Sequence, residues 1–106
     1  MIETLKSETI DRWRSGLRDR RAAARVTAGI DRLAAGNPGD VKPVGPGISE
    51  LRIDVGPGYR VYFLRDGDRL VLLLCGGNKS GQGSDSSDAY GIADEWKNDG
   101  QSKRSL

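Results

Sequence analysis

Hydrophobic residues recur at helical spacing over the first third of the chain. Ile10, Trp13 and Leu17 lie three and four positions apart and predict a first helix over about residues 8–17. A second apolar stripe predicts a longer helix over about residues 19–35, and its members are Ala22, Ala23, Val26, Ile30, Leu33 and Ala34. Glycine and proline at positions 36–39 end this helix, because neither residue type favours a helix interior. We therefore expect a hairpin of two N-terminal helices.

The period of the pattern changes to two after Gly45. Polar and apolar residues alternate from Glu50 to Val55, which is typical of a strand with one solvated face. Residues 59–64 predict the next strand, and the unbroken apolar run at 70–75 predicts a central strand covered on both faces. A further edge strand is expected near the N-terminus or around residues 41–44. The predicted fold class is α+β, with two N-terminal helices packed on an antiparallel sheet of three to four strands.

The composition changes again after Gly77. Residues 80–87 are rich in glycine and serine and predict a loop, and residues 88–97 predict a short C-terminal helix that Gly91 weakens. The polar residues 98–106 are expected to be a disordered tail. A chain of 106 residues has room for one hydrophobic core, so we expect a single domain over residues 1–97.

Composition removes several classes of chemistry. The chain has no histidine and one cysteine, Cys75, which excludes an intramolecular disulfide, a Ser-His-Asp triad, and zinc sites built on histidine or several cysteines. Cys75 ends an apolar run and is expected in the core. No apolar stretch is long enough to span a membrane, and the N-terminus lacks the apolar block of a secretory signal. These absences predict a cytoplasmic protein without cofactor or bound metal.

A net charge of +2 is too small to indicate nucleic-acid binding by itself, but six arginines are concentrated between Arg12 and Arg25. Arg18, Arg21 and Arg25 of this stretch are candidates for contacts with RNA or the ribosome, because a guanidinium binds phosphate through two parallel hydrogen bonds. A solvated helix surface, or a surface that docks an acidic protein, explains the same residues, and the sequence leaves these interpretations open.

Strand alternation places Arg52 on the solvated face, and a regular hairpin adds Arg60 to it. Lys42 precedes this region and Lys79 follows the last strand, so we expect four cations to converge on one concave side, with Tyr62 adding stacking or a hydrogen bond. Such a cluster suits RNA cleavage, in which a 2′-hydroxyl attacks its neighbouring phosphate and negative charge develops on the phosphate oxygens. On composition alone, ordinary ion pairs of the arginines with Glu50 or Asp54 are the simpler interpretation.

Several ordered blocks resemble the HigB-like addiction module killer branch of the RelE/ParE toxin superfamily. The blocks are Gly36-Asn37-x-Gly39-Asp40-x-Lys42, Glu50-Leu51-Arg52-Ile53, Gly56-Pro57-Gly58-Tyr59-Arg60-Val61-Tyr62-Phe63 and Leu73-Leu74-x-Gly76-Gly77-x-Lys79. Trp13-x-x-x-Leu17-Arg18-Asp19 extends the likeness upstream, so that it covers about residues 10–82.

This resemblance implies a small toxin with a curved antiparallel sheet, neutralised by a cognate antitoxin, commonly a helix-turn-helix protein. It also implies metal-free cleavage of mRNA in the ribosome, with the ribosome and mRNA as partners. By position, Arg60 would stabilise the phosphate and Lys79 would contact the phosphate or the leaving group. Lys42 and Arg52 would act as general base or as RNA clamps.

The chain departs from this pattern after Ser80, where relatives usually continue into a basic C-terminal helix and this segment is acidic and rich in glycine and serine. An attenuated toxin that only binds its antitoxin is therefore a second interpretation. ParE-like members of the superfamily inhibit DNA gyrase, which supplies a third.

Overall fold

The computed structural model describes residues 3–37, 39–45, 47–56, 58–67, 70–78 and 88–96. Along the chain its elements are β1 (Glu3–Lys6), α1 (Glu8–Ser15), α2 (Arg20–Ala34), β2 (Val41–Gly45), β3 (Ile48–Ile53), β4 (Tyr59–Asp66) and β5 (Leu70–Asn78). A C-terminal helix follows at residues 88–96. The predicted loop at residues 80–87 and the predicted tail at 98–106 lie outside the described residues, and so does the end of the predicted domain.

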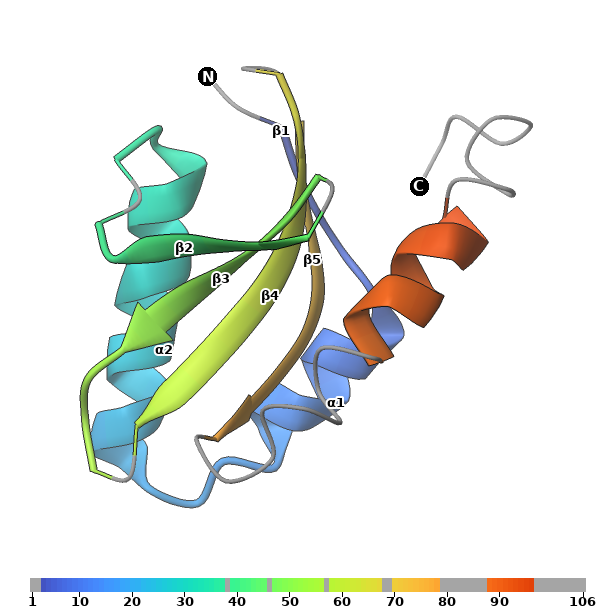
Figure 1. Ribbon diagram of the computed structural model, residues 1–106. Helices are drawn as coiled ribbons and strands as arrows, with labels where there is room; N and C mark the ends of the chain where they lie inside the picture. Colours follow the sequence, from blue (N-terminus) through green and yellow to red (C-terminus); the bar gives the residue numbers. More distant parts are fainter. Residues whose placement is uncertain are drawn as a thin grey trace.

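The strands form one sheet in the order β1-β5-β4-β3-β2, twisted as Figure 1 shows. The predicted α+β class is confirmed, and the sheet is larger than expected because both proposed edge strands, β1 and β2, are present. Neighbours from β2 to β5 are antiparallel, whereas β1 runs parallel to β5. The sheet is therefore mixed, with β5 inside it as the unbroken apolar run predicts.

Both N-terminal helices begin at polar caps. The Ser7 hydroxyl accepts a hydrogen bond from the Ile10 amide at 3.1 Å, and an Asp19 carboxylate oxygen accepts one from the Arg21 amide at 2.9 Å. These side chains satisfy amide groups that have no partner within the first turn of a helix. The caps fix α1 and α2 close to their predicted positions, and α1 ends two residues earlier than expected, before Gly16.

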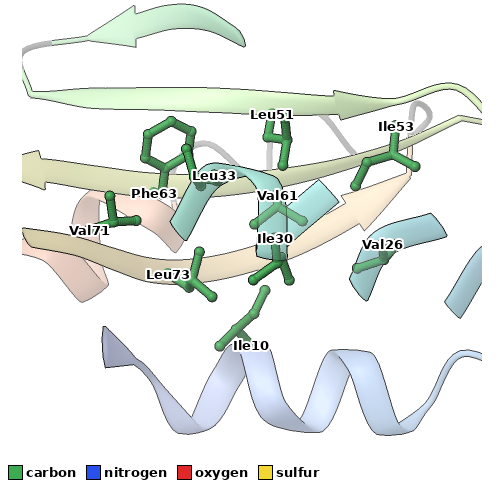
Figure 2. Close-up of a cluster of buried hydrophobic side chains, with 10 residues drawn as sticks. All are labelled: Ile10, Val26, Ile30, Leu33, Leu51, Ile53, Val61, Phe63, Val71 and Leu73. Carbon is green, nitrogen blue, oxygen red and sulfur yellow. The ribbon is translucent and has the colours of Figure 1, made fainter. Parts of the chain in front are cut away.

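The main core lies between the sheet and these two helices. Figure 2 shows Ile10 of α1, together with Val26, Ile30 and Leu33 of α2, beside six side chains of the sheet. The sheet contributes Leu51 and Ile53 of β3, Val61 and Phe63 of β4, and Val71 and Leu73 of β5. These residues belong to the periodic sets that the sequence assigns to buried faces. α1 and α2 therefore cover one face of the sheet.

A second, smaller core covers part of the opposite face. Ala89 and Ala93 of the C-terminal helix pack with Ile48, Tyr62, Leu64, Leu72, Leu74 and Cys75, and Trp96 flanks them. Figure 1 shows this helix on the other side of the sheet from α2. Cys75 is 3% exposed, as expected of a core cysteine. The C-terminal helix thereby borders the face that carries the site.

None of the helices in the described ranges is both long enough and apolar enough to cross a membrane.

Candidate functional site

The pairing of β3 with β4 brings the two predicted arginines together. Arg52 lies directly opposite Arg60, and Glu50 lies opposite Tyr62. Residues directly opposite each other in an antiparallel pair point to the same face of the sheet. Because Leu51, Ile53 and Val61 occupy the face toward α1 and α2, Arg52 and Arg60 occupy the other face. Lys42 of β2 pairs with Glu50, so three of the four expected cations share one face.

Glu50 joins the two arginines. Its Oε1 lies 3.0 Å from Arg52 Nε, which donates a hydrogen bond to it, and its Oε2 lies 3.4 Å from Arg60 Nε. The Glu50 side chain is 0% exposed, against 13% for Arg60 and 39% for Arg52. The expectation that Glu50 lies on the solvated face is therefore wrong, because the carboxylate lies beneath the guanidinium groups.

A carboxylate withdrawn from water is costly unless cations and hydrogen bonds compensate it. Here one nitrogen of each guanidinium supplies part of this compensation. A guanidinium has five N–H donors, so a contact through Nε leaves donor capacity on its two terminal amino groups. Glu50 thus fixes both arginines at one point while their remaining donors stay suited to a second anion.

A hollow of about 420 Å³ adjoins this cluster. It lies at the β3–β4 turn and is lined by Asp40, Arg52, Ile53, Asp54, Gly56, Gly58, Tyr59 and Arg60. The amide of Arg52 donates a hydrogen bond of 2.9 Å to the Asp40 carbonyl, which holds the chain before β2 beside the end of β3. A ligand in this hollow meets two guanidinium side chains and two carboxylates.

Tyr62 does not reach this surface. Its side chain is 0% exposed and belongs to the second core, next to Leu74 and Cys75. The expected stacking or hydrogen bonding of Tyr62 with RNA is therefore not possible in this conformation. Tyr59, which the sequence analysis did not select, lines the hollow and makes an edge contact with Trp13 at a centroid distance of 6.3 Å.

The remaining predicted residues lie in different places. Lys79 falls outside the described residues, so its expected convergence with Arg60 is not tested. Arg18 lies between the two helices, and Arg21 and Arg25 lie in the first half of α2; all three are exposed. Arg25 lines a second hollow, of about 270 Å³, together with Arg52.

Sequence reasoning treated Glu50 only as an ion-pair partner and did not identify it as the buried centre of the site. The available signal was its position, two residues before Arg52, which lies directly opposite Arg60. In the described part of the chain, no group of three or more histidine, cysteine, aspartate and glutamate side chains is placed to hold a metal ion.

Comparison with known proteins places most of the chain within one group of sequences. Residues 17–97 match the family described as Phage derived protein Gp49-like (DUF891). A protein of Haemophilus influenzae described as "Uncharacterized protein" is 52% identical over 94 residues, which cover 89% of this chain and 95% of that relative. The family match contains α2, the strands β2 to β5 and the C-terminal helix, and hence every residue of the cluster around Glu50.

Proposed function

The chain belongs to the phage-derived Gp49-like family, which is related to HigB- and RelE-like toxins, and on this premise we propose that it is the toxin of a type II toxin–antitoxin pair. In this proposal it cleaves mRNA on the ribosome. The observation that supports the activity most directly is the meeting of Arg52 and Arg60 at Glu50 beside an open hollow. Lys42 adds a third cation to the same face.

The proposed reaction needs no added reactant. The RNA 2′-oxygen forms a bond to the adjacent phosphorus and gives up its proton, and the bond from phosphorus to the 5′-oxygen breaks. The 5′-oxygen takes up a proton, which leaves a 2′,3′-cyclic phosphate and a 5′-hydroxyl. Arg60 and Arg52 stabilise the negative charge that develops on the phosphate oxygens, and this stabilisation is strongest where the groups are held in advance. Lys42 acts as an RNA clamp at the rim.

The proposal carries partners and a location with it. The substrate is mRNA in a translating ribosome, so the toxin acts in the cytoplasm. A cognate antitoxin, commonly a helix-turn-helix protein in related systems, holds the toxin inactive. Lys79 is assigned to the phosphate or the leaving group by resemblance alone.

Replacing Arg60 tests the activity. We expect induced expression of the unchanged protein to arrest growth and to cut transcripts within translated regions, and Arg60→Ala to relieve both effects. Arg60 is one of two groups that stabilise the developing negative charge. We expect its removal to lower the cleavage rate about 10²–10³-fold, by analogy with the loss of one hydrogen-bond donor from an oxyanion hole. The measurement is transcript-end mapping beside growth curves.

Arg65→Ala is the matched control, because Arg65 lies on the same strand and by alternation on the other face, where its Nε donates to the Gly67 carbonyl. Arg60→Lys separates loss of charge from loss of fold, since it keeps a cation beside Glu50. If a folded Arg60→Ala protein keeps full toxicity, Arg60 is not part of the active site. Intact transcripts during growth arrest by the unchanged protein would contradict cleavage itself.

A second candidate function has an observation in its favour. Glu50 neutralises part of the charge of Arg52 and Arg60, as a purely structural cross-strand network would. The protein would then act without cleavage, either as a gyrase inhibitor of the ParE type or as an attenuated toxin that only binds its antitoxin. A supercoiling assay with purified gyrase detects the first, and harmless expression with co-purification of the antitoxin indicates the second.

A further inference from the structure

Two hollows lie next to each other at the end of β3, where they share four lining residues. The larger one adjoins the Glu50 cluster, and the smaller one, of about 270 Å³, lies between β3 and α2. Both are lined by Asp40, Arg52, Ile53 and Asp54. They adjoin at the end of β3 beyond Leu51, where Asp40 precedes β2 and its carbonyl accepts a hydrogen bond from the Arg52 amide. A surface path therefore leads past Asp40 and around the end of β3 from one side of the sheet to the other.

The far end of this path carries two arginines of α2. Arg25 and Arg32 both line the smaller hollow, and Gly29 lies between them on the same side of the helix. Seven residues of helix place the two arginine Cα atoms about 10 Å apart along the axis. Both side chains are exposed, and neither forms an ion pair with another residue of the described ranges. These guanidinium groups are free to bind a second anion.

Carboxylates occupy the middle of the path. Asp40 and Asp54 line both hollows, are exposed, and form no ion pair within the described ranges. A phosphate in the middle would be repelled by them, whereas Arg52 and Arg60 at one end and Arg25 and Arg32 at the other attract phosphate. This alternation suits a chain of separated anions with neutral or donor-bearing groups between them, which is the chemistry of a nucleic-acid strand.

We propose that a single strand of RNA leaving the Glu50 cluster bends around the end of β3 and places further phosphates on Arg25 and Arg32. The inference rests on the proposed function and extends it to Arg32, a residue that the sequence analysis did not select. A duplex is too stiff to follow a path from one face of a small sheet to the other, because double-stranded DNA, for comparison, has a persistence length of about 50 nm. Arg18 and Arg21 line neither hollow and lie off this path.

The test measures binding of 2′-O-methyl RNA, which cannot be cleaved by 2′-hydroxyl attack, by fluorescence anisotropy over a range of salt concentrations. The variant is Arg25→Glu with Arg32→Glu. Arg12→Glu with Arg20→Glu is the matched control, since these arginines are equally exposed helix residues outside both hollows and the change in charge is the same. A labelled octanucleotide long enough to cover the path is compared with a dinucleotide that fills only the larger hollow.

We expect the Arg25/Arg32 variant to bind the octanucleotide about tenfold more weakly or worse, with a salt slope lower by about 1.4, because each single-strand phosphate contact contributes about 0.7. Binding of the dinucleotide should not change, and the Arg12/Arg20 control should bind both oligonucleotides like the unchanged protein. An equal loss in variant and control would mean a general charge effect and would overturn the path. Absence of octanucleotide binding by the unchanged protein would also overturn the path. So would an Arg25/Arg32 variant that binds the antitoxin more weakly but binds the octanucleotide as the unchanged protein does.

Cleavage of transcripts during translation separates this inference from the proposed function. If the unchanged protein and the Arg25/Arg32 variant cut transcripts equally well and bind the octanucleotide equally well, the path is wrong and the nuclease assignment stands. If the unchanged protein cuts no transcript, the nuclease assignment fails, whatever the oligonucleotides show.

Discussion

Glu50 has a larger effect on the site than its single charge suggests. It is fully buried, and two guanidinium groups from neighbouring strands converge on its two oxygens. Removing one partner of a buried ion pair costs more than the pair itself contributes, because the remaining charges lose their compensation. Stability and the position of both arginines therefore depend on the same carboxylate.

We expect Glu50→Gln to lower the free energy of unfolding by about 2–4 kcal/mol, because two neighbouring guanidinium groups lose the anion between them. Asp54→Asn is the matched control, since this exposed carboxylate is on the same segment of the chain and forms no ion pair within the described ranges; its effect should stay within about 0.5 kcal/mol. Urea denaturation of both variants provides the measurement. Equal stability of the two proteins would show that Glu50 does not hold the arginines.

Gly29 of α2 provides a prediction of the opposite sign. A methyl group at this position would meet Leu51 Cδ2 at 3.4 Å and Ile53 Cγ1 at 3.6 Å, which is ordinary van der Waals contact. Because alanine is the better helix former by about 1 kcal/mol, Gly29→Ala should stabilise the protein by up to that amount. Gly29→Leu should destabilise it, since a longer side chain has no space against β3. Thermal unfolding distinguishes these outcomes. Destabilisation by alanine would mean that α2 cannot shift away from Leu51 and Ile53 to accommodate the added methyl group.

At the scale of elements, a polar contact joins the C-terminal helix to β2. The Tyr90 hydroxyl donates a hydrogen bond of 3.0 Å to the Val44 carbonyl, and the ring lies against Gly45, where a Cβ atom would overlap the hydroxyl. Tyr90 is 36% exposed, so it can swing aside. The absence of a side chain at Gly45 therefore determines whether this contact forms.

Gly45→Ala and Tyr90→Phe should each destabilise the protein by about 1 kcal/mol, because each removes the same hydrogen bond. The double variant should cost little more than either single one, since a contact can be lost only once. A double-mutant cycle in denaturant measures the coupling. Fully additive costs would show that Gly45 acts through something other than Tyr90.

Gly76 of β5 lies so close to the Trp13 ring that there is no space for a side chain. A Cβ atom there would overlap the six-membered ring of Trp13, which packs against the main core. Overpacking of this kind costs about 1–3 kcal/mol, so we expect Gly76→Ala to lower the melting temperature by several degrees. Gly91→Ala in the C-terminal helix is the control, because nothing lies within 4 Å of its added methyl group and it should be neutral or stabilising.

At the scale of the whole molecule, the two cores share the strands β3, β4 and β5. Unfolding of one core therefore disrupts the strands on which the other core is built. For this reason we expect one cooperative unfolding transition. The two tryptophans report on it separately, since Trp13 packs against the main core and Trp96 against the second. Trp13→Phe and Trp96→Phe should each show the same midpoint by fluorescence as by circular dichroism. Separate midpoints would mean that the C-terminal helix unfolds independently.

The sequence predicted those features that depend on local pattern. Alternation placed Arg52 and Arg60 on one face, and their cross-strand pairing confirms it. Alternation did not distinguish an open face from a covered one, so it assigned Glu50 and Tyr62 to the surface although both are buried. The parallel position of β1 and the hollow that Arg25 and Arg32 share with Arg52 arise from contacts between segments far apart in the chain, which no local pattern encodes.

The parallel pairing of β1 with β5 also has a consequence for synthesis. Ser7, directly after β1, donates its amide to the Leu73 carbonyl and its hydroxyl to the Leu74 carbonyl, sixty-seven positions later. A nascent chain therefore carries β1 unpaired until β5, sixty-seven residues later, has been synthesised. Contacts of such long sequence separation form late in folding. The growing polypeptide thus stays incompletely folded until β5 is available, which gives a binding partner time to engage it before the finished sheet exists.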